Sequence, residues 1–169
     1  MLSREKGGWR MFGFRKKETI TLAAPMSGTV IPLSEVKDAV FSQRLIGDGA
    51  ALIPDDGTVT APLDAVVQQI AATKHAIGLI AKGDVEILIH IGLDTVNLKG
   101  AGFEPKVAAG QPVTAGQVLM QVDLQHLQAS GYDLCTPCVI TNPAKVTQLT
   151  VCRTGKIQRG EPLLTWQVP

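Results

Sequence analysis

The sequence predicts a mainly β fold built from short strands, and three observations favour this class. The 169 residues include 17 glycines and 10 prolines, about one residue in six, which is typical of a chain with many turns. Aromatic side chains make up 4% of the chain whereas hydrophobic residues make up 45%, so Val, Ile, Leu and Ala must form the core. The aliphatic runs are short and bounded by Gly, Pro or Asp, as in strands separated by turns.

The strands can be followed along the chain. A β-rich run comes first, and a Pro/Gly break separates it from the second extended run. The tripeptide KGD at 82–84 predicts a hairpin between two strongly aliphatic strands. In order, we expect strands within residues 19–23, 24–33, 45–53, 58–73, 75–81, 85–93, 112–123 and 162–168.

Two short helices and an internal repeat complete the expected elements. Asp123 is a residue type that caps helix N-termini, and Asn142 followed by Pro143 is a typical cap and first turn. The sequence APMSGTV at 24–30 weakly resembles APLDAVV at 61–67. A turn and strand duplicated once suit a sandwich with pseudo-symmetry better than a solenoid.

The charge of the chain is unevenly distributed. A total of +1 argues against a dedicated nucleic-acid binder, which would carry a basic excess. Residues 1–18 carry six basic and two acidic side chains and three of the seven aromatic residues. We therefore expect a basic, aromatic tail over 1–18 and one domain over 19–169. The composition of the tail suits a flexible solvated segment or a membrane-seeking one.

The expected location is the cytoplasm. No run of 18 apolar residues is present, and the first residues lack the apolar segment of a secretory signal. Attachment of the tail would place the protein peripherally at the inner face of the membrane. Three cysteines are too few for a disulfide scaffold, and we expect the CxxC pair, Cys135 and Cys138, to be small apolar structural residues.

Two of the three histidines stand in settings that suit chemistry. The isoleucines of VEILIHIGL (85–93) share one face of a strand, so His90 lies on the other face. Thr73 and His75 point the same way in an extended segment, where the hydroxyl can fix the imidazole tautomer. A neutral imidazole can act as a nucleophile, and two together could hold a metal. From these residues alone, ordinary surface histidines remain the commoner alternative.

A longer pattern surrounds His90. The segment GDVEILIHIGLDTV (83–96) resembles the phosphohistidine signature of the glucose-type enzyme IIA family of the bacterial phosphoenolpyruvate-dependent sugar phosphotransferase system. The resemblance covers roughly residues 20–168 and implies an antiparallel β-sandwich/barrel hybrid with short peripheral helices. No IIB or IIC sequence is attached, so we expect a stand-alone IIA protein. The resemblance continues through 38–41, 47–49, 61–62, 73–76 and 98–103.

The resemblance also implies roles for individual residues. His90 would accept a phosphoryl group from phospho-HPr and pass it to a cysteine of a IIB domain for sugar uptake. His75 would support the transfer, and Thr73 would orient His75. No cofactor is required, although relatives can share a zinc ion with a partner protein across the His pair. Asp38 and Asp94 would border the site, and the apolar rim that docks HPr, IIB and regulatory proteins would comprise Val40, Phe41, Leu45 and Val96.

The sequence also has features of two other kinds of protein. A biotinyl or lipoyl carrier domain resembles this chain at APMSGTV, but it needs a modifiable lysine in a Met-Lys-Met or Asp-Lys context, which Lys37 and Lys74 lack. A zinc hydrolase using His75 and His90 needs a third protein ligand, and none is evident in the sequence.

Overall fold

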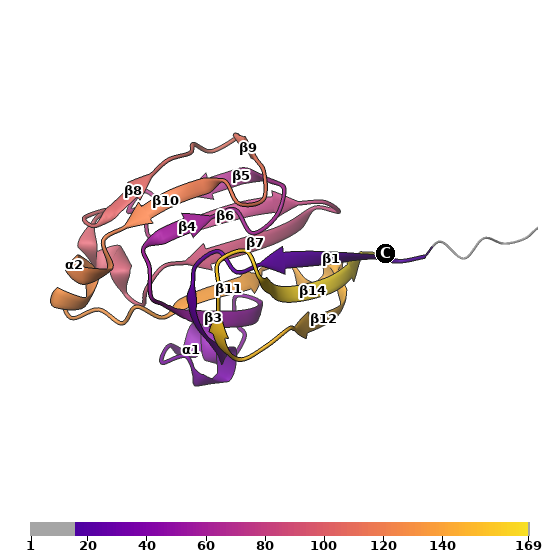
Figure 1. Cartoon of the computed structure of the whole chain (residues 1–169), viewed down its shortest axis with the longest axis horizontal. Coiled ribbons are helices and arrows are strands. Elements are labelled where there is room, and N and C mark those ends of the chain that lie inside the picture. The colour runs from indigo at the N-terminus through magenta and orange to yellow at the C-terminus, as the bar shows by residue number, and fades with distance from the viewer. Residues whose placement is uncertain (1–15, 169) are drawn as a thin grey trace, which may run out of the picture.

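The fold is mainly β, as expected, in a computed structural model that describes residues 16–168 (Figure 1). Its strands form one sheet of eight and two sheets of three, and every strand pairing is antiparallel. The prediction of a tail over 1–18 lies outside the described residues except for its last three. The first strand begins at Glu18, one residue before the expected boundary.

The eight-stranded sheet carries most of the expected aliphatic strands. Its strand order is β13-β2-β3-β11-β7-β6-β5-β9. The hairpin predicted at KGD joins β6 to β7, and these two strands pair along their whole length, from Ala76 opposite His90 to Ala81 opposite Val85. The strands run over Gly28–Pro32 (β2), Asp48–Pro54 (β3), Ala65–Ile70 (β5), Ala76–Ala81 (β6), Val85–His90 (β7), Pro112–Val113 (β9), Thr136–Ile140 (β11) and Gly155–Ile157 (β13).

The two smaller sheets share the main hydrophobic core with the large sheet. One has the order β1-β14-β12 and the other β4-β10-β8. The single strand expected over 58–73 is interrupted at 61–64, so its first part joins β10 while its second part, β5, joins the large sheet. The bounds are Glu18–Ala23 (β1), Thr58–Thr60 (β4), Phe103–Pro105 (β8), Val118–Val122 (β10), Thr147–Val151 (β12) and Pro162–Val168 (β14).

The helices are short and peripheral. Asp123 caps α2 (Leu124–Ala129), as predicted, by accepting a hydrogen bond from the His126 amide. The helix expected after Asn142 is only a 3-10 turn, η3 (Pro143–Lys145), because the Asn142 side chain accepts from the Glu86 amide instead of capping the turn. The remaining helical segments are η1 (Leu33–Glu35), α1 (Ala39–Ser42) and η2 (Thr95–Leu98). Within 16–168, no helix has the length and apolar composition needed to cross a bilayer.

Two hydrophobic clusters lie on opposite faces of the large sheet. Along β7 the burial alternates strictly, and Ile87 and Ile89 enter the main core. Leu88, between them, packs against a second cluster on the other face. The strand β11 contributes to both clusters, so all five of its residues are buried. The second cluster comprises Leu33, Val36, Phe41, Ala51, Leu93, Cys135 and Val139.

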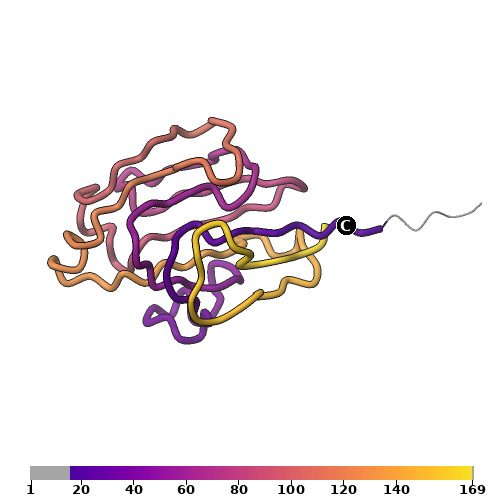
Figure 2. Tube along the Cα trace, viewed as in Figure 1, coloured from indigo at the N-terminus to yellow at the C-terminus, as the bar shows by residue number. Residues whose placement is uncertain are grey.

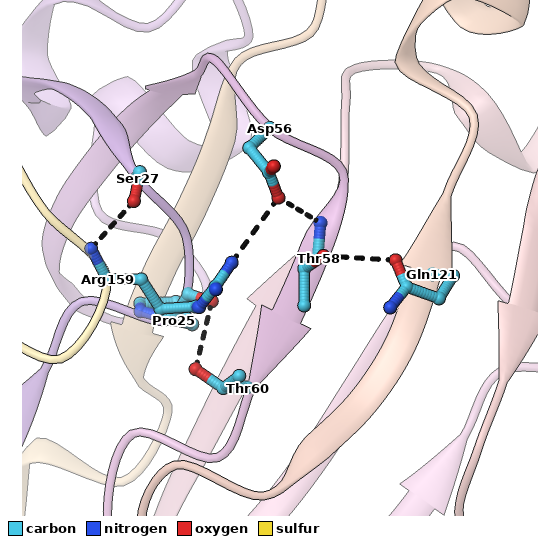
Figure 3. A network of polar contacts seen from close by, with 7 residues as sticks. All are labelled: Pro25, Ser27, Asp56, Thr58, Thr60, Gln121 and Arg159. Atoms are coloured by element: carbon cyan, nitrogen blue, oxygen red, sulfur yellow. Dashed lines mark hydrogen bonds and ion pairs between the residues drawn. The ribbon is translucent and has the colours of Figure 1, made fainter.

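The repeated sequence marks a pair of crossing segments. The Ala23 amide donates to the Pro62 carbonyl, and the Thr60 amide donates to the Pro25 carbonyl, both at 2.9 Å. In both bonds the donor is the residue just before a repeat, and the acceptor is the proline at the second position of the other repeat. The Thr60 hydroxyl also reaches the Pro25 carbonyl, within a polar network around this crossing (Figure 3). The duplicated sequence therefore reflects a local pseudo-twofold arrangement.

The ends of the described chain lie side by side. Glu18 of β1 is paired with Val168 of β14, so the first and last strands meet at the edge from which residues 16 and 17 lead away (Figure 2). A Cβ added to Gly83, at the tip of the β6–β7 hairpin, would lie 3.1 Å from the Val168 side chain. The hairpin tip is thus at the chain ends, and His90 is at the other end of β7.

Candidate functional site

His90 is the last residue of β7. The alternation of that strand sends its neighbours Ile89 and Ile91 into the main core and leaves His90 partly exposed on the opposite face. Its ring is therefore held by a strand whose backbone is anchored through fully buried side chains, while the ring itself can be reached from solvent. The strand prediction placed His90 on this face correctly.

A backbone carbonyl determines which nitrogen of His90 is available. Nδ1 lies 2.8 Å from the carbonyl oxygen of Gly92. Because a carbonyl oxygen can only accept, Nδ1 must carry the proton and donate. In the neutral ring Nε2 then holds the lone pair. The site thus leaves Nε2 of His90 with an unused lone pair.

His75 lies beside His90. The two rings are 4.9 Å apart between centroids and meet edge to face at 79°. Nδ1 of His75 is 2.7 Å from the hydroxyl oxygen of Thr73, the contact that the sequence predicted, although residues 72–75 form a turn, with Lys74 at a φ of +62°, and not the expected extended segment. The backbone also links the pair, because the His75 carbonyl accepts from the Ile91 amide at 2.8 Å. Both histidines and Thr73 therefore form one connected unit.

Phe41 lies behind the imidazole of His90 instead of on the open rim. Its ring centroid is 5.1 Å from that of His90, and only 3% of the residue is exposed. The short helix α1, capped by the Asp38 side chain at the Val40 amide, turns Phe41 inward and Val40 outward. A direct role for Phe41 in docking, as the resemblance implied, does not fit this burial, and Phe41 instead supports the His90 ring.

The other expected rim residues are exposed. Val40 is 38% exposed, Leu45 68% and Val96 47%. Ile46 is also 37% exposed, and the sequence did not lead us to predict it. The signal was the pair of apolar residues, Leu45 and Ile46, directly before Gly47. Val40 lies in α1, the helix that brings Phe41 against His90, and the Leu45 amide donates to the Val40 carbonyl. Exposed apolar side chains that form a patch are typical of a protein-binding surface.

The electrostatics of the site favour neutral imidazoles. Burial lowers the pKa of His90, and this effect outweighs the Gly92 hydrogen bond and the nearby carboxylates of Asp38 and Asp94, which act to raise that pKa. Burial also lowers the pKa of His75, and the adjacent His90 lowers it further. Both rings are therefore mainly neutral at pH 7, so the lone pair of His90 Nε2 is available.

The zinc site that the resemblance implies stays a prediction, in which His75 and His90 would supply two ligands and a partner protein the others. Over residues 16–168 no group of three His, Cys, Asp or Glu side chains is placed to hold a metal, so the zinc-hydrolase alternative lacks its third ligand there. Cys135 and Cys138 are buried in different clusters, and burial is the main cause that raises each thiol pKa to about 12. Their structural interpretation is favoured.

Comparisons with known proteins agree on one family. The model of a family described as the phosphoenolpyruvate-dependent sugar phosphotransferase system, EIIA 1, matches residues 20–146. A glucoside-specific EIICBA component from Staphylococcus carnosus is 48% identical over 141 residues, which are 83% of this chain and 20% of that protein. A glucose-specific EIICBA component from Staphylococcus saprophyticus is 51% identical over 123 residues, 73% of this chain and 18% of that protein. The chain spans about a fifth of the length of these relatives.

A solved structure shares the fold. The glucose permease IIA from Mycoplasma capricolum superimposes with a TM-score of 0.83 at 38% sequence identity. The match covers 88% of this chain and 96% of that chain. The expected antiparallel β-sandwich with short peripheral helices is confirmed by this likeness and by the sheet topology.

Proposed function

This chain belongs to the EIIA 1 family of the phosphoenolpyruvate-dependent sugar phosphotransferase system, and on that premise we propose that it carries a phosphoryl group on Nε2 of His90. The observation that carries the proposal is the bond between His90 Nδ1 and the Gly92 carbonyl. It leaves Nε2 as the one free nitrogen of a partly exposed ring. The donor would be the phosphohistidine of HPr and the acceptor a cysteine of a IIB domain.

The transfer balances without an added proton. The lone pair of His90 Nε2 attacks the phosphorus and the donor's P–N bond breaks. The donor imidazole, which carries a proton on its other nitrogen, leaves with that electron pair as a neutral ring. A new P–N bond forms on His90. In the second step a cysteine thiolate of the acceptor attacks the same phosphorus, and His90 leaves as a neutral ring. Because a phosphoramidate is already reactive, positioning is the main task of the protein.

His75 would act on the phosphoryl oxygens. Its ring contacts that of His90 at a centroid distance of 4.9 Å, and Thr73 holds its Nδ1. If Nδ1 of His75 carries the proton and donates it to the Thr73 oxygen, Nε2 of His75 has no proton to donate to phosphate. If the Thr73 hydroxyl instead donates to Nδ1, the proton of the neutral ring lies on Nε2, which can then donate to phosphate. We assign the second arrangement to the phosphorylated state, in which His75 supports transfer to the acceptor.

The exposed apolar side chains around the pair would dock the partners. Phosphorylation adds about −1.5 to −2 charges next to Asp38 and Asp94, which changes the electrostatics of the docking face. One surface could thus bind different partners before and after transfer, including regulatory proteins. A partner that contributes further ligands could also complete a zinc site with His75 and His90.

Phosphoryl transfer from phosphoenolpyruvate through enzyme I and HPr tests the assignment. We expect His90→Gln to take up no label, and His75→Gln to take up label but pass it on poorly to a IIB domain. His126→Gln is the matched control, because His126 is exposed on α2 and should behave as the parent does. Normal labelling of His90→Gln would overturn the proposal.

The basic tail is proposed as a weak contact with anionic membrane. Residues 1–18 carry a net charge of +4 and three aromatic residues, and each basic side chain near such a surface contributes about 1 kcal/mol. The full chain should sediment with phosphatidylserine-containing vesicles more than a chain that starts at Thr19. Equal sedimentation of the two would rule out the contact.

A further inference from the structure

We infer that Thr95 is a positioning residue for phosphoryl transfer, because it restrains the backbone at Ile91 and Gly92, and the Gly92 carbonyl selects the tautomer of His90. The inference rests on the proposed function of His90. Thr95 is the first residue of η2 and is completely buried, although its side chain is polar. The family resemblance implied no role for Thr95. Its buried side chain is not part of the exposed docking face, and it makes no hydrogen bond to either histidine ring.

The hydroxyl of Thr95 ties down the chain just before Gly92. It donates to the carbonyl oxygen of Ile91 at 2.6 Å. A buried carbonyl that lost this donor would be left with less hydrogen bonding in a setting without water, which is costly. Thr95 therefore holds the Ile91–Gly92 peptide unit through its carbonyl. The preceding unit, His90–Ile91, is held through the Ile91 amide, which donates to the His75 carbonyl at 2.8 Å.

The methyl group of Thr95 fills the space beside Gly92. A Cβ placed on Gly92 would lie only 2.5 Å from Cγ2 of Thr95, so the methyl occupies the position that a side chain would need. Gly92 has a φ of +74°, a left-handed conformation that glycine adopts freely. Thr95 thus contacts Gly92 directly, and this contact restricts how far its backbone can turn.

The next peptide unit transmits this restraint to the reactive ring. The Gly92 carbonyl and the Leu93 amide belong to one planar unit. Its amide donates to the Asp133 carbonyl at 2.9 Å, and its carbonyl accepts from His90 Nδ1 at 2.8 Å. Rotation of the unit would weaken both bonds. Once Nδ1 has lost its acceptor, the proton can move to Nε2, where it blocks the nucleophilic lone pair.

Two variants separate the hydroxyl from the methyl. Thr95→Val keeps the shape and removes the donor, whereas Thr95→Ser keeps the donor and removes the methyl. The control is Thr60→Val, because Thr60 is also buried and also donates to a backbone carbonyl, that of Pro25, but lies on β4 in another sheet. Figure 3 shows this control contact.

The first measurement is the ¹⁵N NMR spectrum of the imidazoles at pH 8. The parent and Thr60→Val should show His90 almost entirely protonated at Nδ1, and Thr95→Val should show a larger population protonated at Nε2. Thr95→Ser should fall between them. This readout does not require phosphate, so it remains informative even if His90 proves not to be the phosphorylated residue.

The second measurement is the rate of phosphoryl uptake from phospho-HPr. We expect Thr95→Val to be about two- to tenfold slower, the factor that corresponds to the loss of one hydrogen bond. Thermal unfolding will show that the variants are folded. A folded Thr95→Val protein with the parent's tautomer and uptake rate would overturn the inference, and so would an equal tautomer shift in Thr60→Val. If Thr95→Val does not fold, the same comparison on Thr95→Ser decides.

Discussion

Replacing Gly92 with alanine should lower the free energy of unfolding by about 2–5 kcal/mol, and two separate costs contribute. The left-handed φ of +74° costs a residue with a Cβ about 1–2 kcal/mol. The new Cβ would also lie 2.5 Å from the Thr95 methyl and 3.1 Å from the Asp133 carbonyl oxygen. Because Thr95 is completely buried, it cannot withdraw, and such overpacking typically costs about 1–3 kcal/mol.

A second glycine separates these two costs. Gly131 also has a positive φ, +87°, but a Cβ there would have no neighbour within 4 Å. Gly131→Ala should therefore lose only the conformational part, about 1–2 kcal/mol. Urea unfolding followed by circular dichroism would measure both variants. If Gly92→Ala is no less stable than Gly131→Ala, the crowding argument is refuted.

Three further outcomes are expected. Burial lowers the pKa of both site histidines below 6.5, so just below that pH the unfolded chain binds more protons than the folded chain. The contribution of these histidines to stability should therefore be complete above pH 6.5 and should decrease as the pH falls. Urea unfolding at about pH 5 and pH 8 should show this difference in the parent and a smaller one in His90→Gln. In the native protein a thiol reagent should modify the exposed Cys152 rapidly, and Cys135 and Cys138 only after unfolding, because their thiols are buried; three equal rates would contradict this. Asp123→Ala removes the cap of α2 and should lower the free energy of unfolding, measured with urea, by about 0.5–2 kcal/mol. Asp123→Asn can still accept from the His126 amide and should keep most of this stability.

The central strand and the histidine pair could be predicted because local rules determine them. Alternation along 85–91 is enough to place the isoleucines in the core and His90 on the opposite face, and the structure confirms both. The predicted contact between Thr73 and His75 forms, but not in the extended segment that was expected: residues 72–75 make a turn with Lys74 at a φ of +62°, and this turn brings the two side chains together. The alternation of side chains along a strand is a local property, so it can be predicted without knowing which strands pair.

Other features depend on contacts that the local sequence does not contain. Asn142 has the signature of a helix cap, but the backbone of β7 competes for its side chain, so only a 3-10 turn forms. The four residues of α1 are too few for a periodic pattern, and without that helix Phe41 cannot be assigned to the inside. The role of Thr95 likewise becomes visible only when the Ile91 carbonyl and Gly92 are seen around it.

The pairing of Glu18 with Val168 has a consequence for how this domain can be tethered. Both ends leave beside the tip of the β6–β7 hairpin, and the five steps along β7 from Val85 to His90 span about 17 Å. A polypeptide joined next to Glu18 or Val168 would therefore be attached at the end of the domain opposite His90. Such an attachment would leave the face that carries His90 uncovered.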